Sequence, residues 1–80
     1  MYYPFNASAE GENVRMYYDG SGRLEYVCKA RPGTAESDEG WQIRRFFYDG
    51  ASTDASKISY ANGQTGHIFS AADRASYNYD

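Results

Sequence analysis

Hydrophobic and polar positions alternate most regularly over residues 41–48, which end at the turn signal Asp49-Gly50. A period of two is typical of a β-strand, because successive side chains point to opposite faces of a sheet. One alternate set is mostly apolar and is predicted to face the core, whereas the other set is mixed. The apolar set comprises Trp41, Ile43, Arg45 and Phe47. We therefore expect this segment to be the central strand of a sheet.

Residues 13–31 predict a hairpin, with one strand over 14–18 and a second over 24–31. The residues between them, 19–22, tolerate positive φ and so favour a tight turn. Alternation places Leu24, Tyr26 and Cys28 on one apolar face of the second strand. Cys28 is therefore expected to be a small buried hydrophobic residue rather than a nucleophile, since no base lies near it in the sequence.

Shorter elements are expected in the last third of the chain. A strand over residues 57–61 presents its apolar side chains on one face and ends at the turn signal Asn62-Gly63. Residues 70–75 favour one helical turn, and residues 76–79 alternate in the manner of a terminal strand. The predicted structural core comprises Leu24, Tyr26, Cys28, Trp41, Ile43, Phe47, Ile58 and Tyr60.

Two segments of the chain are similar to each other in sequence. Residues 14–20 and 44–50 both end in Tyr-Asp-Gly, and each is followed by an aliphatic-x-tyrosine strand. Two similar hairpins predict an all-β fold, a small antiparallel meander that forms a compact barrel or sandwich of about five to six strands. Residues 1–12 show neither period and contain an early proline, so we expect an extended N-terminal arm followed by a single β domain over residues 13–80.

Composition indicates how such a fold would be stabilised. The chain has 80 residues, nine tyrosines, one cysteine and one histidine, so an internal disulfide is excluded and a zinc site is not expected. A chain this short buries only about 60% of its unfolded surface. Tyrosine, with its polar hydroxyl, suits partly hydrated interfaces better than cores that exclude water. We therefore expect protein partners, including copies of the same chain, and no metal or cofactor.

Charge and hydropathy narrow the classes of partner. The net charge of −3 gives no electrostatic reason to bind a polyanion, and alternation sends Arg44 and Arg45 to opposite faces, so nucleic acid is not the expected ligand. No apolar run approaches the ~20 residues needed to cross a bilayer. The first residues lack the basic and apolar regions of a signal peptide, so we expect synthesis in a cytoplasm.

Candidate catalytic chemistry is sparse. His67 stands alone, and no phosphate loop, nucleophile elbow or paired ligand motif is present, so the protein is predicted not to be an enzyme and no catalytic residue is assigned. Arg45 lies on the apolar face of its strand and needs a partner for its charged head, for which Glu25 and Asp73 are candidates. Arg74 is a second candidate for an ion pair that fixes the end of the chain.

Aromatic side chains near the two ends are the candidate partner contacts. Three exposed rings on a free arm would be an aggregation hazard, and two further rings in the last strand need a surface to lie on. The predicted partner-binding residues are Tyr2, Tyr3, Phe5, Tyr77 and Tyr79. An alternative function is carbohydrate binding, because Trp41 and exposed tyrosines can stack on sugar rings.

Four blocks of sequence, in this order, resemble a family of small uncharacterised proteins encoded by tailed bacteriophages. The blocks are Tyr26-Val27-Cys28-Lys29-Ala30-Arg31-Pro32-Gly33-Thr34-Ala35, Trp41-Gln42-Ile43-Arg44-Arg45, Ile58-Ser59-Tyr60-Ala61-Asn62-Gly63 and Asp73-Arg74-Ala75-Ser76-Tyr77-Asn78-Tyr79. The resemblance implies a structural protein of the virion, made in the host cytoplasm, that contacts copies of itself and other virion proteins. Capsid decoration, a neck or tail component and a fibre-associated part are all compatible with it.

Overall fold

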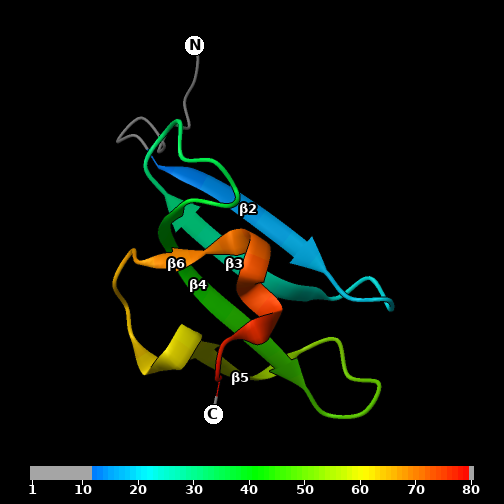
Figure 1. Cartoon of the computed structure of the whole chain (residues 1–80). Coiled ribbons are helices and arrows are strands. Elements are labelled where there is room, and N and C mark those ends of the chain that lie inside the picture. The colour runs from blue at the N-terminus through cyan, green and yellow to red at the C-terminus, as the bar shows by residue number, and fades with distance from the viewer. Residues whose placement is uncertain (1–11, 80) are drawn as a thin grey trace.

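The computed structural model describes residues 12–79, which form an antiparallel sheet with little helix (Figure 1). In chain order the elements are β2 (Asn13–Tyr18), β3 (Leu24–Ala30), β4 (Glu39–Tyr48), β5 (Ala55–Tyr60), the 3-10 helix η1 (Ala61–Gly63), β6 (Phe69–Ser70) and the 3-10 helix η2 (Ala71–Ser76). The predicted all-β fold is confirmed. The expected arm over residues 1–12 lies outside the described residues except for Glu12.

The strands form a meander in the order β2-β3-β4-β5, and β6 pairs with β4. β3 occupies one edge of β4, so β5 and β6 share the other edge: β6 pairs with the first residues of β4 and β5 with its last five. β4 is therefore the central strand, as predicted. The sheet is open rather than closed into a barrel, and its second layer is the C-terminal segment that includes η2 (Figure 1).

The core lies on one face of the sheet, which we call the inner face and define by Tyr26, Cys28, Trp41 and Ile43. Trp41, Ile43 and Cys28 are fully buried there, as the alternation predicted. The covering residues come from the end of the chain: Ala61, Phe69, Ala71 and Tyr79 complete the cluster of buried residues. Phe47 is half-buried and packs against this cluster, so its prediction as a core residue holds in part.

A loop over residues 31–38 folds back over the inner face. The indole Nε1 of Trp41 donates a hydrogen bond to the backbone carbonyl of Ala35 at 2.8 Å. The backbone N–H of Ala72, in η2, donates to the carbonyl of Glu36 at 3.0 Å. The buried tryptophan thus has its one polar group satisfied, and the loop is joined to the segment that covers the sheet.

The chain end is fixed by Asn62 rather than by a terminal strand. Residues 76–79 were expected to form a strand, but η2 continues to Ser76 and the residues after it do not pair with the sheet. Asn62 adopts φ 51°, a conformation that asparagine tolerates better than most residues. Its side-chain oxygen accepts from the backbone N–H of Asn78 at 2.9 Å, and its own N–H donates to the carbonyl of Asn78 at 2.6 Å.

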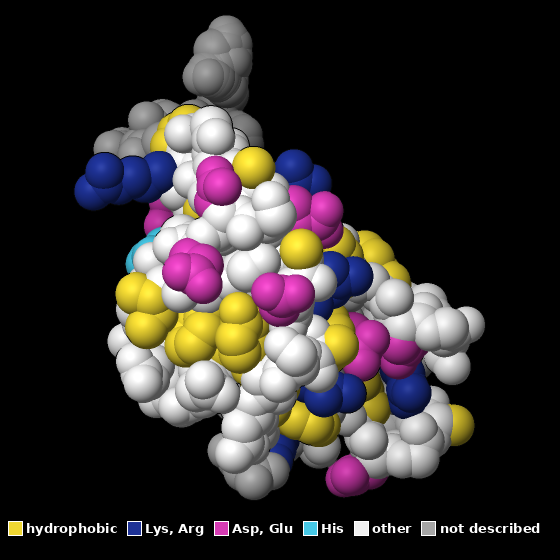
Figure 2. Space-filling view, in the orientation of Figure 1, with side chains coloured by type: hydrophobic (Ala, Val, Ile, Leu, Met, Phe, Trp, Pro, Cys, Tyr) yellow, Lys and Arg dark blue, Asp and Glu magenta, His cyan; other side chains and the backbone are white. Residues whose placement is uncertain are grey.

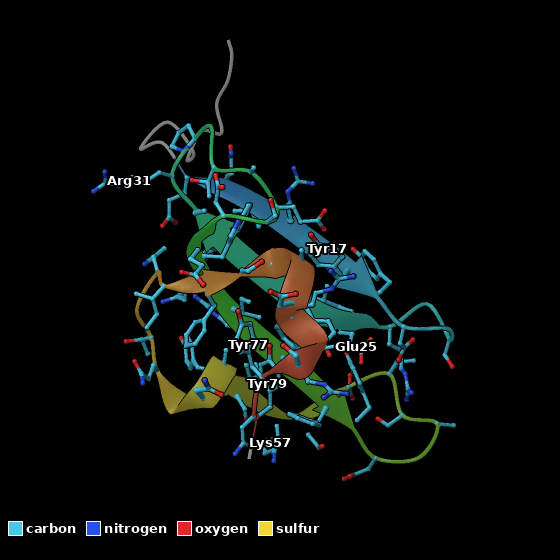
Figure 3. The ribbon with its side chains drawn as sticks, viewed as in Figure 1. Tyr17, Glu25, Arg31, Lys57, Tyr77 and Tyr79 are labelled. Carbon is cyan, nitrogen blue, oxygen red and sulfur yellow. The ribbon has the colours of Figure 1, made fainter. Side chains whose placement is uncertain are left out.

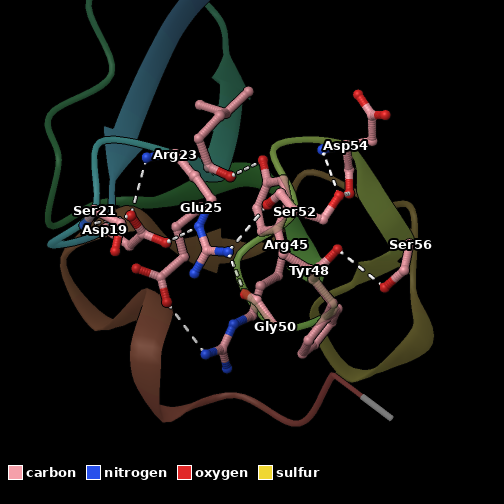
Figure 4. Close-up of polar contacts among 12 residues, drawn as sticks. Asp19, Ser21, Arg23, Glu25, Arg45, Tyr48, Gly50, Ser52, Asp54 and Ser56 are labelled. Carbon is pink, nitrogen blue, oxygen red and sulfur yellow. Dashed lines mark hydrogen bonds and ion pairs between the residues drawn. The ribbon is translucent and has the colours of Figure 1, made fainter.

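Two hairpin turns meet at one end of the sheet and are joined by Arg23 (Figure 4). In the first turn the Asp19 carboxylate accepts from the backbone N–H groups of Arg23 and Ser21. These bonds, with the Arg23 backbone N–H as the largest cause, lower the pKa of the Asp19 carboxyl. The Arg23 guanidinium also donates to the carbonyls of Gly50 and Ser52 in the second turn. One arginine therefore holds both turns together.

β-Bulges change which residues face the core. The pairing of β2 with β3 runs from Tyr17↔Tyr26 to Tyr18↔Leu24, so Glu25 is an extra residue in β3. Leu24 was predicted to be in the core with Tyr26, and this prediction is wrong. The bulge pairs Leu24 with a residue of the opposite face, and Leu24 is half-buried outside the core cluster.

The predicted core positions of Ile58 and Tyr60 are also wrong. β5 pairs Ile58 with Phe46 and Tyr60 with Arg44, two residues on the face of β4 opposite to Trp41. Ile58 is exposed and Tyr60 is half-buried outside the core cluster. The two residues do share a face, as predicted, but the register of β5 places them on the side away from the core.

Candidate interaction surface

The sheet face opposite the core, which we call the outer face, carries most of the exposed large hydrophobic side chains among residues 12–79. Alternation along each strand and the pairing between strands assign residues to this face. Its members include Val14, Met16, Tyr18, Leu24, Val27, Lys29, Gln42, Arg44, Phe46, Tyr48, Ile58 and Tyr60. One register row, Met16↔Val27↔Arg44↔Tyr60, crosses all four strands of the meander.

The exposure of these side chains is high for large hydrophobic residues. Val14 is 46% exposed, Met16 55% and Tyr18 60% on one edge strand, and Ile58 is 52% exposed on the other. Among the described residues, these are four of the five large hydrophobic side chains that are exposed. The fifth, Ile68, lies in the connection between β5 and β6. An apolar set gathered on one face in this way is typical of a surface that contacts another molecule.

The two sides of the sheet differ in what covers them. η2 and β6 lie on the side of the sheet nearest the viewer in Figure 1. Figure 2 shows the same side as a surface on which hydrophobic, acidic and basic side chains are intermixed. The outer face lies on the far side of that view. Within residues 12–79, no outer-face residue belongs to the core cluster. Val27, which is 9% exposed, is the most buried residue of the outer face.

Arg44 lies in the middle of the outer face, between Val27 of β3 and Tyr60 of β5. Its guanidinium carbon is 5.5 Å from the centroid of the Tyr60 ring. Its Nε atom is buried and has no hydrogen-bond partner among residues 12–79. Arg44 is therefore the one strongly basic group at the centre of an otherwise apolar row.

Arg45, the next residue, has a different environment on the inner face. Its guanidinium lies 5.3 Å from the ring of Tyr26, 5.0 Å from that of Phe47 and 5.7 Å from that of Tyr79. It also forms an ion pair with Glu25 at 3.2 Å (Figure 4), which is one of the two candidate partners, Glu25 and Asp73, named from the sequence. The bulge at Glu25 allows this contact, because strict alternation would point that carboxylate to the outer face.

Arg74 joins the C-terminal segment to the sheet, as predicted. Its guanidinium carbon lies 3.6 Å from the centroid of the Tyr17 ring, and its Nη1 is 3.7 Å from the Glu36 carboxylate. The Tyr17 hydroxyl donates to the same carboxylate at 2.7 Å. Burial, aided by this hydrogen bond, raises the pKa of Tyr17 to about 12. The cluster is a closed set of mutual contacts that fixes η2 on the inner face.

The two predicted partner contacts near the C-terminus belong to this chain's own fold. Tyr79 is buried, its ring meets that of Tyr26 edge-on at 5.8 Å, and its hydroxyl donates to the carbonyl of Arg74. Burial raises the pKa of Tyr79. Tyr77 is half-buried against Phe69, and its hydroxyl accepts from the backbone N–H of Ser70 (Figure 3). The expectation that these rings need a surface holds, but that surface is the inner face.

The remaining predicted partner contacts, Tyr2, Tyr3 and Phe5, lie outside the described residues. The outer face itself was missed as a candidate site. The signal for it was present in the pattern Val14-x-Met16-x-Tyr18, in which every second residue of an edge strand is a large hydrophobic side chain.

Trp41 is not available to stack on a sugar ring. It is fully buried beneath the loop that contains Ala35, so the carbohydrate-binding alternative loses its main residue. Tyr18 is the one tyrosine among residues 12–79 whose side chain is exposed. The part of the alternative that depends on Trp41 is therefore wrong.

Nucleophilic and acid–base groups are separated from one another. Cys28 is fully buried, as predicted, and burial raises the pKa of its thiol from 9.0 to about 11. A thiol in this state is a poor nucleophile. His67 lies at the surface, with its Nε2 atom 3.3 Å from the Glu12 carboxylate. His67 and Glu12 border a hollow of about 480 Å³, which is also lined by Arg31, Thr34 and Gly40.

Within residues 12–79, no group of three or more His, Cys, Asp or Glu side chains is placed to hold a metal ion. Among the same residues, no helix has the length and hydropathy needed to span a membrane.

Comparison with known proteins identifies no relative of this chain. No family model, curated protein or solved structure matches this chain.

Proposed function

We propose that this protein is a non-enzymatic structural subunit that works by packing its outer face against neighbouring proteins. The observation that supports this function is the gathering of exposed hydrophobic side chains on one side of an open sheet. Both edge strands contribute, through Met16 on β2 and Ile58 on β5, so the apolar area extends across the whole meander. Apolar surface of this kind gains free energy when a partner removes it from water.

The setting we propose is a bacteriophage particle, made in the host cytoplasm and assembled into the virion. Support for this setting comes from the resemblance of four sequence blocks to small tailed-phage proteins. Neighbours in such a particle would be other virion proteins and copies of the same chain. Capsid decoration, a neck or tail position and a fibre-associated position are each compatible with a small subunit that binds through one face.

Particle incorporation tests this function. A phage genome that encodes the chain with Met16→Thr and Ile58→Thr would be compared with one that encodes Ile68→Thr, the matched change at the exposed hydrophobic residue away from the outer face. Threonine keeps the preference for strands while removing apolar area. We expect gradient-purified particles to lose the double variant and to retain the Ile68 variant. Equal incorporation of both, or absence of the unmodified chain from particles, would contradict the proposal.

The carbohydrate-binding alternative depends on a different result. Among the described aromatic residues it would use Tyr18, the exposed ring of β2. Tyr18→Ala should then abolish binding to host-surface glycans, whereas incorporation into particles should be unchanged. Glycan binding by the unmodified protein that is lost in this variant would favour attachment over packing.

A further inference from the structure

The outer face is basic as well as apolar. Its members include Lys29 and Arg44 and no acidic residue. This balance is opposite to that of the whole chain, which has eleven acidic and eight basic residues. A surface that is apolar and positively charged complements one that is apolar and negatively charged.

A β-bulge accounts for the missing carboxylate. In a regular strand, Glu25 would share a face with Val27 and Lys29 and would place a negative charge on the outer side. As the extra residue of the bulge, Glu25 instead pairs with Arg45 at 3.2 Å on the inner side. The local backbone therefore removes from the outer face the carboxylate that could have neutralised Arg44.

Arg44 lacks the partners that its neighbour has. Its contact on the outer face is the Tyr60 ring, and no carboxylate among residues 12–79 pairs with it, whereas Arg45 pairs with Glu25. A guanidinium presents several N–H donors that match a carboxylate. A carboxylate brought to the centre of the register row Met16↔Val27↔Arg44↔Tyr60 would lie beside this guanidinium and between apolar side chains.

We propose that the outer face binds a segment of a different protein, one that carries apolar side chains on either side of a carboxylate that pairs with Arg44. This inference rests on the proposed function and specifies the partner. A second copy of the chain fits poorly, because a two-fold axis would bring together two faces that each carry Lys29 and Arg44 and no acidic group. Like charges opposed in this way disfavour association.

The size and spacing of the face specify the probe. Neighbouring strands lie about 4.8 Å apart, and alternate residues of an extended segment about 7 Å apart, so three alternate side chains extend over about three strand spacings. The probe is the acetylated and amidated peptide Tyr-Thr-Glu-Thr-Val, in which the tyrosine, glutamate and valine point to one side. The matched peptide has glutamine in place of glutamate and differs only in charge.

Binding of both peptides to the isotopically labelled full chain would be measured by NMR titration at low salt. We expect perturbed resonances at Val27, Arg44 and Tyr60, with the glutamate peptide binding about threefold to tenfold more tightly, as expected for a partly exposed ion pair. Arg44→Met should remove this preference. Arg15→Met, the same change at an exposed arginine on the inner side of β2, should leave the preference intact.

Several outcomes would overturn the inference. Equal affinity for the two peptides would show that charge does not select the partner. Resonance changes confined to the inner side would place the site elsewhere. A dimer in analytical ultracentrifugation that Ile58→Thr dissociates would identify a second copy as the occupant. Peptide binding that appears only after removal of residues 1–11 would identify those residues as the occupant.

The inference and the proposed function can fail separately. Incorporation of the chain into particles depends on any apolar contact made by the outer face and does not require a carboxylate. Loss of the peptide preference with normal incorporation would therefore reject the partner chemistry alone. A retained preference with no incorporation would reject the particle setting alone.

Discussion

Both faces of the sheet carry aromatic and aliphatic side chains, yet the described chain covers the inner face alone. On the inner face Trp41 and Ile43 are fully buried, whereas on the outer face Met16 and Ile58 remain more than half exposed. Strand propensity and alternation are similar on the two sides, so these local properties do not distinguish them. The difference comes from the C-terminal segment, which can lie on one side of the sheet only.

The adjacent arginines of β4 show the same contrast in a single pair. Arg45 contacts three aromatic rings and a carboxylate, whereas Arg44 contacts one ring. The Nε atom of each arginine is buried without a hydrogen-bond partner among residues 12–79, so the difference lies in the carboxylate. The inner face thus gives its arginine a carboxylate partner from within the chain. The outer face retains both apolar area and hydrogen-bonding capacity, which are the two properties that a binding surface needs.

The largest expected difference between the faces is at Trp41. Trp41→Ala should lower the free energy of unfolding by about 3–5 kcal/mol, because it leaves a cavity and removes the hydrogen bond to Ala35. Total stabilities are about 5–15 kcal/mol for a domain, so the loss would be severe. Urea unfolding followed by circular dichroism would measure it. Trp41→Phe, which keeps a ring, should cost less, and equal stability of all three proteins would contradict a core centred on this residue.

A matched pair of isoleucines compares the faces directly. Ile43→Ala on the inner face should cost about 2–5 kcal/mol, because Ile43 is fully buried. Ile58→Ala on the outer face should cost less than about 1 kcal/mol, because the side chain already contacts water. Denaturant midpoints of the two variants provide the measurement. Similar losses at both positions would mean that the outer face is covered in solution.

Alkaline pH should weaken the inner face. The neutral thiol of Cys28 is favoured in the fold, since burial raises its pKa from 9.0 to about 11. Because the folded pKa is the higher one, ionisation favours the unfolded chain, and the stabilisation is complete below pH 9 and lost as the pH rises through about 11. The expected slope is about 1.4 kcal/mol per pH unit between these values.

Unfolding in urea at pH 8, 9, 10 and 11 would test this prediction. Burial also raises the pKa of the tyrosines Tyr17, Tyr26 and Tyr79, so a part of the decline should begin above pH 10 and persist without the thiol. Cys28→Ala should remove the part that begins at pH 9. An unfolding free energy that stays constant from pH 8 to pH 11 would contradict the burial of these groups.

The smallest expected difference is between the two arginines. Arg45→Met should cost about 1 kcal/mol through loss of the ion pair with Glu25 and the ring contacts, which are partly exposed. Arg44→Met should change the stability of the isolated chain by less than about 0.5 kcal/mol, because its loss leaves no partner unpaired. Thermal unfolding of both variants at low and high salt would measure the two losses of stability. A greater loss at Arg44 would reverse the assignment of the faces.

Much of the fold follows from local sequence pattern. The alternation around Trp41 and Cys28 predicted the central strand, the second strand and the residues that both strands bury. The failures at Leu24, Ile58 and Tyr60 have a different origin. The face of these residues depends on the bulge at Glu25 and on the pairing of β5 with β4, and such register is set by distant contacts that a local period does not contain.

The candidate site was less predictable for the same reason. Tyr79 stands among polar residues near the end of the sequence and has the local character of a surface residue. Its burial requires the bonds between Asn62 and Asn78 and the 3-10 turn before it, which together direct the ring onto Tyr26. Which face remains uncovered, and hence which residues form the interaction surface, depends on that placement.

The order of the elements along the chain has a consequence for folding during synthesis. All four strands of the meander leave the ribosome before Phe69, Ala71 and Tyr79, the residues that cover its core. A sheet that formed before these residues emerge would expose both of its sides to water, a state in which partly folded chains are prone to aggregate. A chaperone or an early neighbour that shields the nascent sheet would act in the interval before residue 79 emerges.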